Sequence, residues 1–272
     1  MTLLPLTALL LGLLSSAVAA PSVAPSFDCQ SAATAREIAV CNDPALAQTD
    51  RELDAAWRAA IAKFDKASDQ TAAAKLRDDQ RRFLQGLDDG FDAELWGKAG
   101  PPDDDTMRAR ALALSRDGDD HILGGLDAQL RERIAFLRAL SPAISYAGLW
   151  KSADAEMLIA PGTDGRFQVS FGTTTYGWFK YHCHFTGDEF QDTVRGLVSE
   201  RAHNSDPEID DDVVSTLIVA RQGDALTLTE IIPENADPAA PHHICPREPG
   251  FGETLFHTDL KEADARRLDP GE

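Results

Sequence analysis

Residues 28–57 read DCQSAATAREIAVCNDPALAQTDRELDAAW and hold two cysteines, the bounds of one short helix and the start of another. Thr34 and Glu37 have the spacing of a capping box, in which the hydroxyl accepts from a first-turn amide and the carboxylate reaches back. A short helix is therefore expected to begin after Thr34 and to end near Cys41. The Asn-Asp-Pro step at 42–44 predicts a second helix, because Asn and Asp cap helices and proline suits the first helical position.

The four cysteines fall two in each half of the sequence. Cys29 and Cys41 flank the first helix, close enough for a disulfide across a loop of 13 residues. A bridge over such a loop is worth about 3 kcal/mol on the loop-entropy estimate. Pairing of Cys183 with Cys245 would tie the Pro-rich segment 233–249 to a strand. An even number of cysteines in an exported chain is consistent with these two disulfides.

A wider pattern surrounds the first two cysteines, consisting of Phe27-Asp28-Cys29, Thr34, Glu37, Ile38, Cys41, Asp43-Pro44, Leu46, Asp50 and Leu53. This pattern resembles the N-terminal domain of the LprI-type lysozyme-inhibitor family. The resemblance covers about residues 27–91, with an outer limit near 140, and it implies lysozyme inhibition. That family often has a further cysteine after its next helix, near an Arg-Asp step, whereas residues 80–91 here contain none.

The first residues have the features of a secretory signal peptide. Residues 3–14 are almost wholly apolar, and small residues follow at 15–20, with cleavage expected after Ala19. The apolar run is shorter than the ~20 residues that span a membrane. No cysteine lies near the cleavage site to carry a lipid. We therefore expect removal of residues 1–19, a periplasmic or secreted protein, no membrane span and no lipoprotein anchor.

The charge of the chain is strongly negative. It has 45 Asp and Glu against 26 Lys and Arg, a formal net charge of -19. Such a charge repels nucleic acid and anionic lipid surfaces, so neither is expected as a partner. A cationic partner is one explanation of the charge, and solubility in the cell envelope is the other.

The first half of the chain has helical periodicity, and we expect four to five helices over residues 27–141. The apolar stripe of the long helix after Pro44 comprises Leu46, Leu53, Trp57, Ala60, Ile61 and Phe64. The next helix has Leu76, Phe83, Leu84, Leu87 and Phe91 inward, and Arg77, Asp78, Asp79, Arg81 and Arg82 outward. Further helices are expected at 106–115 and from 119 or 127 to 140, and the Gly124-Gly125 pair is a possible break. Trp57 and Phe83 are expected in the core.

The second half has the pattern of an antiparallel β domain over residues 146–260, followed by a tail at 261–272. Strands are expected at about 148–151, 156–160, 166–171, 176–185, 193–199, 213–220, 225–231 and 251–260. Sequential hairpins without intervening helices predict a meander, closed as a small barrel or folded as a sandwich. The fold class is therefore α+β, with a disulfide-stapled helical domain before the β domain.

The sequence contains no recognisable catalytic motif, so we expect no catalytic residues. It lacks a Gly-x-Ser-x-Gly elbow, a phosphate-binding glycine loop, His-Glu-x-x-His and Cys-x-x-Cys. The strongest metal candidates are His182, His184, His242 and His243, which a Cys183–Cys245 bridge would bring together around Zn. The favoured alternative is exposed histidines, because no carboxylate at ligand spacing completes the set. Residues 206–212 offer oxygens to Ca but lack the loop's spacing and glycine, which favours a solvated acidic loop.

We expect a periplasmic binding protein that inhibits a cationic, lysozyme-like peptidoglycan hydrolase, or protects against one as an immunity factor. The charge fits this function, because an acidic protein is steered toward a cationic enzyme. Loops at 198–212 and 235–249 are the candidates for insertion into the enzyme's cleft. The alternatives are a metal-binding envelope enzyme that uses the four histidines, and an envelope interaction module without inhibitory activity.

Overall fold

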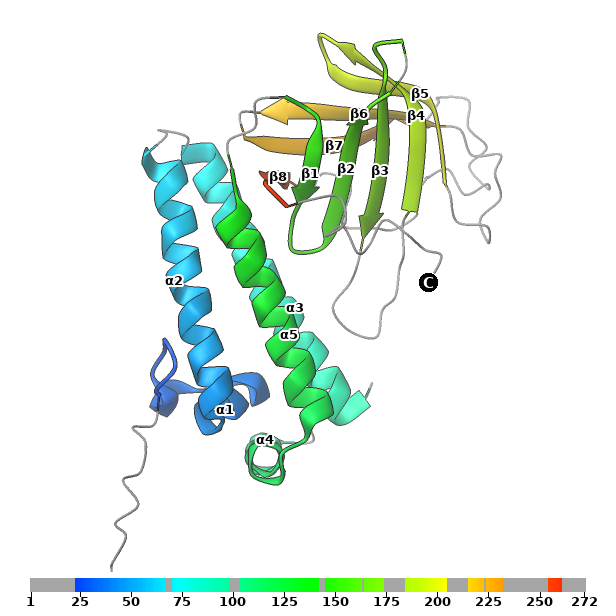
Figure 1. The fold of residues 1–272 in the computed structure, drawn as a ribbon. Coiled ribbons are helices and arrows are strands. Elements are labelled where there is room, and N and C mark those ends of the chain that lie inside the picture. The colour runs from blue at the N-terminus through cyan, green and yellow to red at the C-terminus, as the bar shows by residue number, and fades with distance from the viewer. Residues whose placement is uncertain are drawn as a thin grey trace, which may run out of the picture.

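The structure, a computed structural model, describes residues 23–66, 70–97, 103–141, 145–162, 164–173, 184–204, 215–222, 224–231 and 254–260. Within these ranges, five α-helices come first in the chain and eight strands follow (Figure 1). The strands close into one antiparallel barrel. The α+β fold class and the disulfide-stapled helical domain are thereby confirmed, and the β domain is a barrel. No helix of the described part combines the length and apolar character needed to cross a membrane.

The helices begin and end where the cap residues predict. A 3-10 turn precedes them, and the elements are η1 (Cys29–Ser31), α1 (Ala35–Asn42), α2 (Pro44–Lys66), α3 (Gln70–Trp96), α4 (Asp104–Asp117) and α5 (Asp120–Ala139). Thr34 and Glu37 form the predicted capping box at the start of α1. Gly118, with φ of 67°, ends α4 in the left-handed region that favours glycine. The Gly124-Gly125 pair does not break α5, which runs continuously through it.

The predicted apolar stripes form the helical core. Leu53, Phe64, Leu76 and Phe83 are all at most 6% exposed, and α5 adds buried residues such as Leu137. Phe83 is a core residue, as predicted. Trp57 is only partly buried and packs against the edge of the same cluster.

Apolar side chains fill the interior of the barrel, and strands that are neighbours in the barrel also follow one another in the sequence. Its strands are β1 (Gly148–Lys151), β2 (Ala155–Pro161), β3 (Phe167–Thr173), β4 (His184–Thr193), β5 (Gly196–Asn204), β6 (Ser215–Gln222), β7 (Ala225–Ile231) and β8 (Thr254–Thr258). The strand β8 pairs with both β7 and β1, which closes the sheet. Trp150, Met157, Phe171 and Phe190 are at most 1% exposed and fill the interior.

One strand position predicted from the sequence is wrong. The residues expected to begin a strand at 193 instead end β4, and a turn at 194–195 leads into β5. The acidic run before Thr193 hides this strand, because only Phe190 in that run carries the buried apolar signal. Of the strand predicted at 176–185, residues 176–183 lie outside the described residues.

The outer wall of the barrel packs on the helical core. Ala153, Ala225 and Phe256 come from the barrel but belong to the hydrophobic cluster of the helices. The rings of Phe64 and Phe256 meet edge to face, with centroids 6.1 Å apart. A backbone hydrogen bond also joins the two parts, in which Asp259 N, just after β8, donates to Ala139 O at the end of α5 at 2.9 Å.

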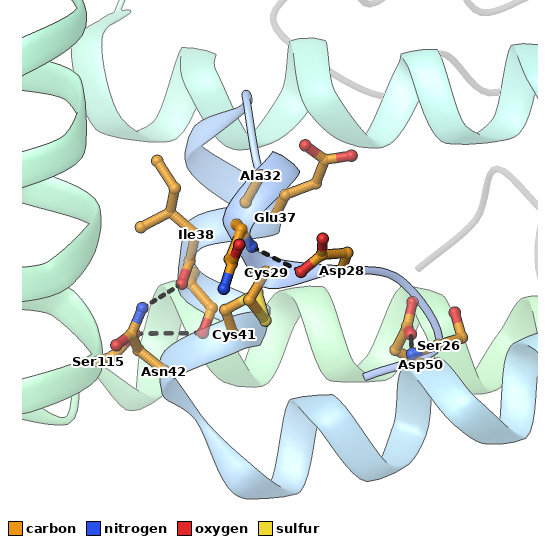
Figure 2. The surroundings of a disulfide bond; sticks show 12 residues. Ser26, Asp28, Cys29, Ala32, Glu37, Ile38, Cys41, Asn42, Asp50 and Ser115 are labelled. Atoms are coloured by element: carbon orange, nitrogen blue, oxygen red, sulfur yellow. Dashed lines mark hydrogen bonds between the residues drawn. A yellow bond between two sulfur atoms is a disulfide. The ribbon is translucent and has the colours of Figure 1, made fainter. Parts of the chain in front are cut away.

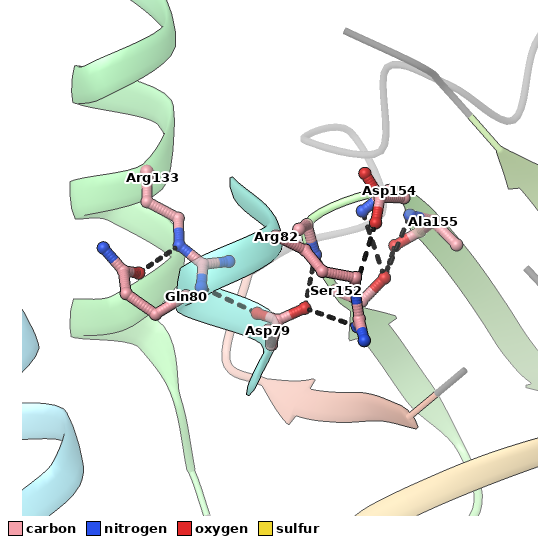
Figure 3. A network of polar contacts seen from close by, with 8 residues as sticks. Asp79, Gln80, Arg82, Arg133, Ser152, Asp154 and Ala155 are labelled. Carbon is pink, nitrogen blue, oxygen red and sulfur yellow. Dashed lines mark hydrogen bonds and ion pairs between the residues drawn. The ribbon is translucent and has the colours of Figure 1, made fainter. Parts of the chain in front are cut away.

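A buried carboxylate joins α3, α5 and the β1–β2 turn (Figure 3). Asp79 is 0% exposed. Its Oδ2 accepts from Arg133 Nη2 on α5 at 2.7 Å, and its Oδ1 accepts from Ala153 N in the turn at 2.7 Å. Arg82 on α3 lies 3.4 Å from the same Oδ1 and also reaches Asp154 at 3.4 Å. Each part of the molecule therefore supplies a donor to one acid.

The partner of Asp79 is itself enclosed. Arg133 is 4% exposed, and its guanidinium carbon lies 4.9 Å from the Phe83 ring centroid and 4.6 Å from that of Phe136. Its Nε donates to Gln80 Oε1 at 2.9 Å. The two rings and the hydrogen bonds hold the fork of the guanidinium in the plane that Asp79 requires.

The sequence prediction that Asp79 points to solvent is wrong. At helical spacing Asp79 lies three residues after Leu76 and four before Phe83, which places it beside the apolar stripe of α3, and only its charge suggested a solvent-exposed side chain. The barrel turn covers this edge of the stripe, so Asp79 is buried, while its neighbour Asp78 keeps a side chain that is 55% exposed.

A second ion pair is buried at the same interface. Lys151 and Glu156 are paired across β1 and β2, and Lys151 Nζ lies 2.6 Å from Glu156 Oε1. They are 4% and 0% exposed on the outer wall of the barrel. Glu132 on α5 approaches Lys151 Nζ at 3.5 Å. The helices thus cover a polar part of the barrel, and the opposite charges there are paired as burial requires.

Replacing Asp79 tests the cost of opening this network. Asp79→Ala should lower the free energy of unfolding by about 3–5 kcal/mol, because Arg133 would stay buried without its countercharge. Asp79→Asn should lose less, since its amide oxygen can still accept from Ala153 N. Urea unfolding followed by circular dichroism measures both variants.

Asp78→Ala is the matched control, because it removes an exposed acid from the neighbouring position. Its contact with Arg81 is on the surface, so a change of less than about 1 kcal/mol is expected. Equal effects of Asp78→Ala and Asp79→Ala would contradict the assigned role of Asp79.

Candidate interaction surface

The first candidate surface is the corner formed by η1 and α1 (Figure 2). Cys29 and Cys41 form a disulfide with their Cα atoms 5.8 Å apart. Asp28 caps η1 by accepting from Gln30 N at 2.9 Å. Residues 28–31 are exposed, whereas one face of α1 is buried in the helical core. The bridge therefore fixes an exposed turn to a buried helix.

Two helices distant in the sequence hold α1 in place. Asp88 on α3 accepts from Thr34 Oγ1 at 3.0 Å and from Arg36 Nε at 2.7 Å. On the side of α4, Ser115 Oγ donates to Ala39 O at 3.3 Å, and Arg108 donates to Ala32 O at 3.3 Å. These contacts join α1 and the residues just before it to α3 and α4, which together form one corner of the domain.

Carboxylates gather beside this corner on α3. Asp88, Asp89 and Asp92 occupy one stretch of the helix, and Asp88 forms an ion pair with Arg36. Burial raises the pKa of Asp92, and the negative charges of Asp88 and Asp89 raise that pKa further. The corner therefore presents a group of acids, and one of them, Asp92, ionises less readily than an ordinary aspartate.

The predicted metal and cysteine sites fall mostly in other parts of the chain. Cys183, Cys245, His182, His242 and His243 lie outside the described residues. His184 begins β4, where its backbone is described and its side chain is not. The acidic segment 206–212, and the inserting loops at 198–212 for the most part and 235–249 entirely, also lie outside. These sites remain predictions.

The described residues contain little that would support catalysis. No three His, Cys, Asp or Glu side chains within them are grouped closely enough to hold a metal ion. A serine and a histidine do meet, since Ser141 Oγ lies 2.9 Å from His257 Nδ1. The His257 ring packs against Trp150 and Gly148, where a Cβ added to Gly148 would lie 2.6 Å from Nε2. This contact joins the end of α5 to β8, and the backbone of Gly148 on β1 approaches Nε2 closely.

The residues that sequence reasoning missed belong to the interface between the helices and the barrel. Asp79, Arg133, Lys151 and Glu156 are all charged and buried. For Asp79 and Arg133 a signal existed, because each lies at helical spacing beside an apolar stripe, three residues after Leu76 and Leu130 respectively. Lys151 and Glu156 carry no such signal, because their burial depends on the helices that cover the outer wall of the barrel.

Comparison with known proteins identifies the first part of the chain. Residues 28–113 match the family model described as Lysozyme inhibitor LprI. The match includes η1, α1, α2 and α3 and ends within α4, so α5 and the barrel lie beyond it. The resemblance inferred from the cysteine and helix pattern is thereby confirmed for the helical domain. No curated protein and no solved structure matches the chain.

The raised pKa of Asp92 predicts a pH-dependent gain in stability on its replacement. A folded-state pKa above the ordinary 3.8 means that the proton on Asp92 stabilises the fold at low pH. This contribution disappears as the pH rises through the raised pKa. Asp92→Asn should therefore raise the urea midpoint at pH 7, and the gain should shrink below about pH 4.

Glu94→Gln provides the control, because Glu94 is an exposed acid two positions further along α3. It removes the same charge without relieving the cluster around Asp92. An Asp92→Asn protein that is no more stable than Glu94→Gln at pH 7 would contradict the interpretation.

Proposed function

We propose that this protein is an exported inhibitor of a lysozyme-like peptidoglycan hydrolase. The observation that carries the proposal is the family match of residues 28–113 to lysozyme inhibitors. The signal-peptide pattern of residues 1–19 supports an extracytoplasmic location, where such a hydrolase meets its substrate. On this proposal the chain acts by binding the enzyme and carries out no reaction itself.

The distribution of charge supports a cationic target. Residues 142–272 contain 23 Asp and Glu against 10 Lys and Arg, which gives this half a formal net charge of -13. The remainder of the chain therefore contributes only -6 of the total of -19. A negative field centred on the barrel would accelerate the encounter with a cationic enzyme, and salt would weaken it.

The packing of helices on barrel supports a role for both parts. Asp79 joins the helical domain to the barrel by accepting from the buried Ala153 N, and Glu132 on α5 approaches Lys151 of the barrel at 3.5 Å. A hydrolase that docks on one part would meet the other in a constant orientation. The family-matching domain and the acidic barrel would then form a single binding body.

Inhibition of hydrolysis is the direct test. Excess protein should slow the turnover of peptidoglycan by at least one enzyme in a panel of lysozymes of several structural classes. The effect should persist at physiological salt, where the Debye length is about 8 Å and nonspecific charge pairing weakens. Turbidity loss of a cell-wall suspension measures the rate.

An unrelated protein of similar size and net charge is the control at each salt concentration. Unchanged turnover across the panel would overturn the proposal. If inhibition occurred only at low salt and the control protein inhibited equally, the effect would be nonspecific charge pairing and the proposal would be wrong. An immunity factor would act on a single hydrolase in the panel, whereas a general inhibitor would act on several.

A further inference from the structure

The tip of the β4–β5 hairpin extends beyond the start of β3 and beyond the Leu197–Val219 pair that is the last between β5 and β6. The last pair between β3 and β4 joins Phe167 to Phe190, whereas β4 continues to Thr193 with β5 as its only partner. Residues 191–195, here called the arm, are all exposed. Phe190 and Leu197 at its base are 0% exposed and fix it in the barrel core.

Both strands of the hairpin bend together. Between Phe167 and Val169, two steps along β3 face three steps along β4. Between Ser199 and Ala202, three steps along β5 face two along β6. The pairing of β4 with β5 keeps one register throughout, so the two irregularities act on the hairpin as a unit. Bulges bend a strand and redirect its end, and Figure 1 shows the hairpin turning at the top of the barrel.

The tip of the arm is rigid. Thr193 Oγ1 accepts from Arg195 N at 3.1 Å and donates to Gly196 O at 2.9 Å. Gly196 has φ of 114°, and a Cβ there would lie 2.4 Å from Val219 O, so this position requires glycine. A tip held in this way loses little conformational entropy on binding.

The side chains at the tip are not those that a turn requires. Glycine, proline, asparagine, aspartate and serine dominate turns because they adopt or stabilise turn geometry. Here Val194 and Arg195 occupy the two central positions, and neither has a positive φ. Val194 is 107% exposed, against 42% for Leu112 and 40% for Ile231, the other exposed large hydrophobic side chains of the described residues. The tip thus offers an apolar group and a cation that the fold does not use.

We propose that the arm enters the substrate cleft of the target hydrolase, with Arg195 facing its catalytic carboxylates and Val194 packing against the cleft wall. The inference rests on the proposed function and deepens it. Glycan hydrolases commonly place two Asp or Glu side chains on either side of the scissile bond. The arm ends in a two-residue turn with exposed side chains, so it can enter a cleft end-on with Val194 and Arg195 foremost.

The chemistry of the tip differs from that of its surroundings. The barrel half is acidic and would draw a cationic enzyme toward it at long range. At the cleft itself, acidic side chains of the barrel would be repelled by the catalytic carboxylates of the enzyme. Arg195 places a cation in the turn itself, while the acid of the arm, Asp192, lies three residues further back on β4. The guanidinium of Arg195 can pair with a carboxylate through two hydrogen bonds.

Exchange of the charge at the tip tests the inference. Arg195→Glu should raise the inhibition constant at least about tenfold for a lysozyme that the native protein inhibits, as expected of a central contact residue. Val194→Ser should weaken inhibition in the same direction. Both side chains are exposed, so thermal unfolding should show that the variants keep the native stability.

Arg166→Glu is the matched control, because it makes the same change in charge at the exposed β2–β3 turn of the same barrel end. It should change the inhibition constant by less than about threefold, since it alters only long-range attraction. A short N-acetylglucosamine oligosaccharide that fills the cleft should compete with the native protein.

The outcomes separate the two proposals. If the native protein inhibits while Arg195→Glu and Arg166→Glu behave alike, or the oligosaccharide does not compete, the inference is wrong and the inhibitor function stands. If the native protein inhibits no lysozyme of the panel, the proposed function fails, and the inference that rests on it fails too.

Discussion

The carboxylate of Asp79 is the contact on which the arrangement of this molecule depends. It lies with 0% exposure between a helix of the family-matching domain, a helix beyond it and the first turn of the barrel. A buried charge is tolerated only when donors replace its lost hydration. Asp79 finds those donors in Arg133, in Ala153 N and in Arg82, which no single part of the chain supplies together. The acid therefore specifies how the parts fit, as well as stabilising them.

The helix α5 mediates this connection. It lies beyond the family match, yet it packs along α2, supplies Arg133 to Asp79 and supplies Glu132 to Lys151. Its C-terminus continues into backbone pairing with β8 through Leu140 and Thr258. The barrel is thus attached by the chain itself, by the hydrogen bond from Ala153 N to Asp79 and by the approach of Glu132 to Lys151. The consequence for function is that a contact made by the barrel is positioned relative to the helical domain.

Much of the fold could be predicted from local sequence. The caps at Thr34 and Gly118, the apolar stripes of the long helices and most of the hairpins follow from preferences that neighbouring residues satisfy among themselves. The strand from 184 to 193 was displaced in the prediction, because Phe190 is the only apolar residue of the acidic run 188–192 and no alternation of apolar residues is visible there. The Cys29–Cys41 disulfide could be predicted for the same reason as the caps, because the two cysteines are close in the chain.

The candidate site was less predictable, for a physical reason. Asp79 lies beside the apolar stripe of its helix, but its burial as a charged residue depends on a barrel turn 74 positions later, which a helical pattern does not reveal. The exposure of Val194 depends on where β3 begins, because β4 runs on to Thr193 after its last pair with β3, Phe190 with Phe167. Composition indicated a cationic partner, whereas the location of a cation at the tip of an acidic barrel required the register of the strands.

Differential scanning calorimetry tests most directly whether the helices and the barrel form one cooperative unit. If Asp79 and the surrounding interface couple them, the native protein should unfold in a single transition whose calorimetric and van't Hoff enthalpies agree. Two separate transitions, or a calorimetric enthalpy well above the van't Hoff value, would show that the parts unfold independently and would contradict the account.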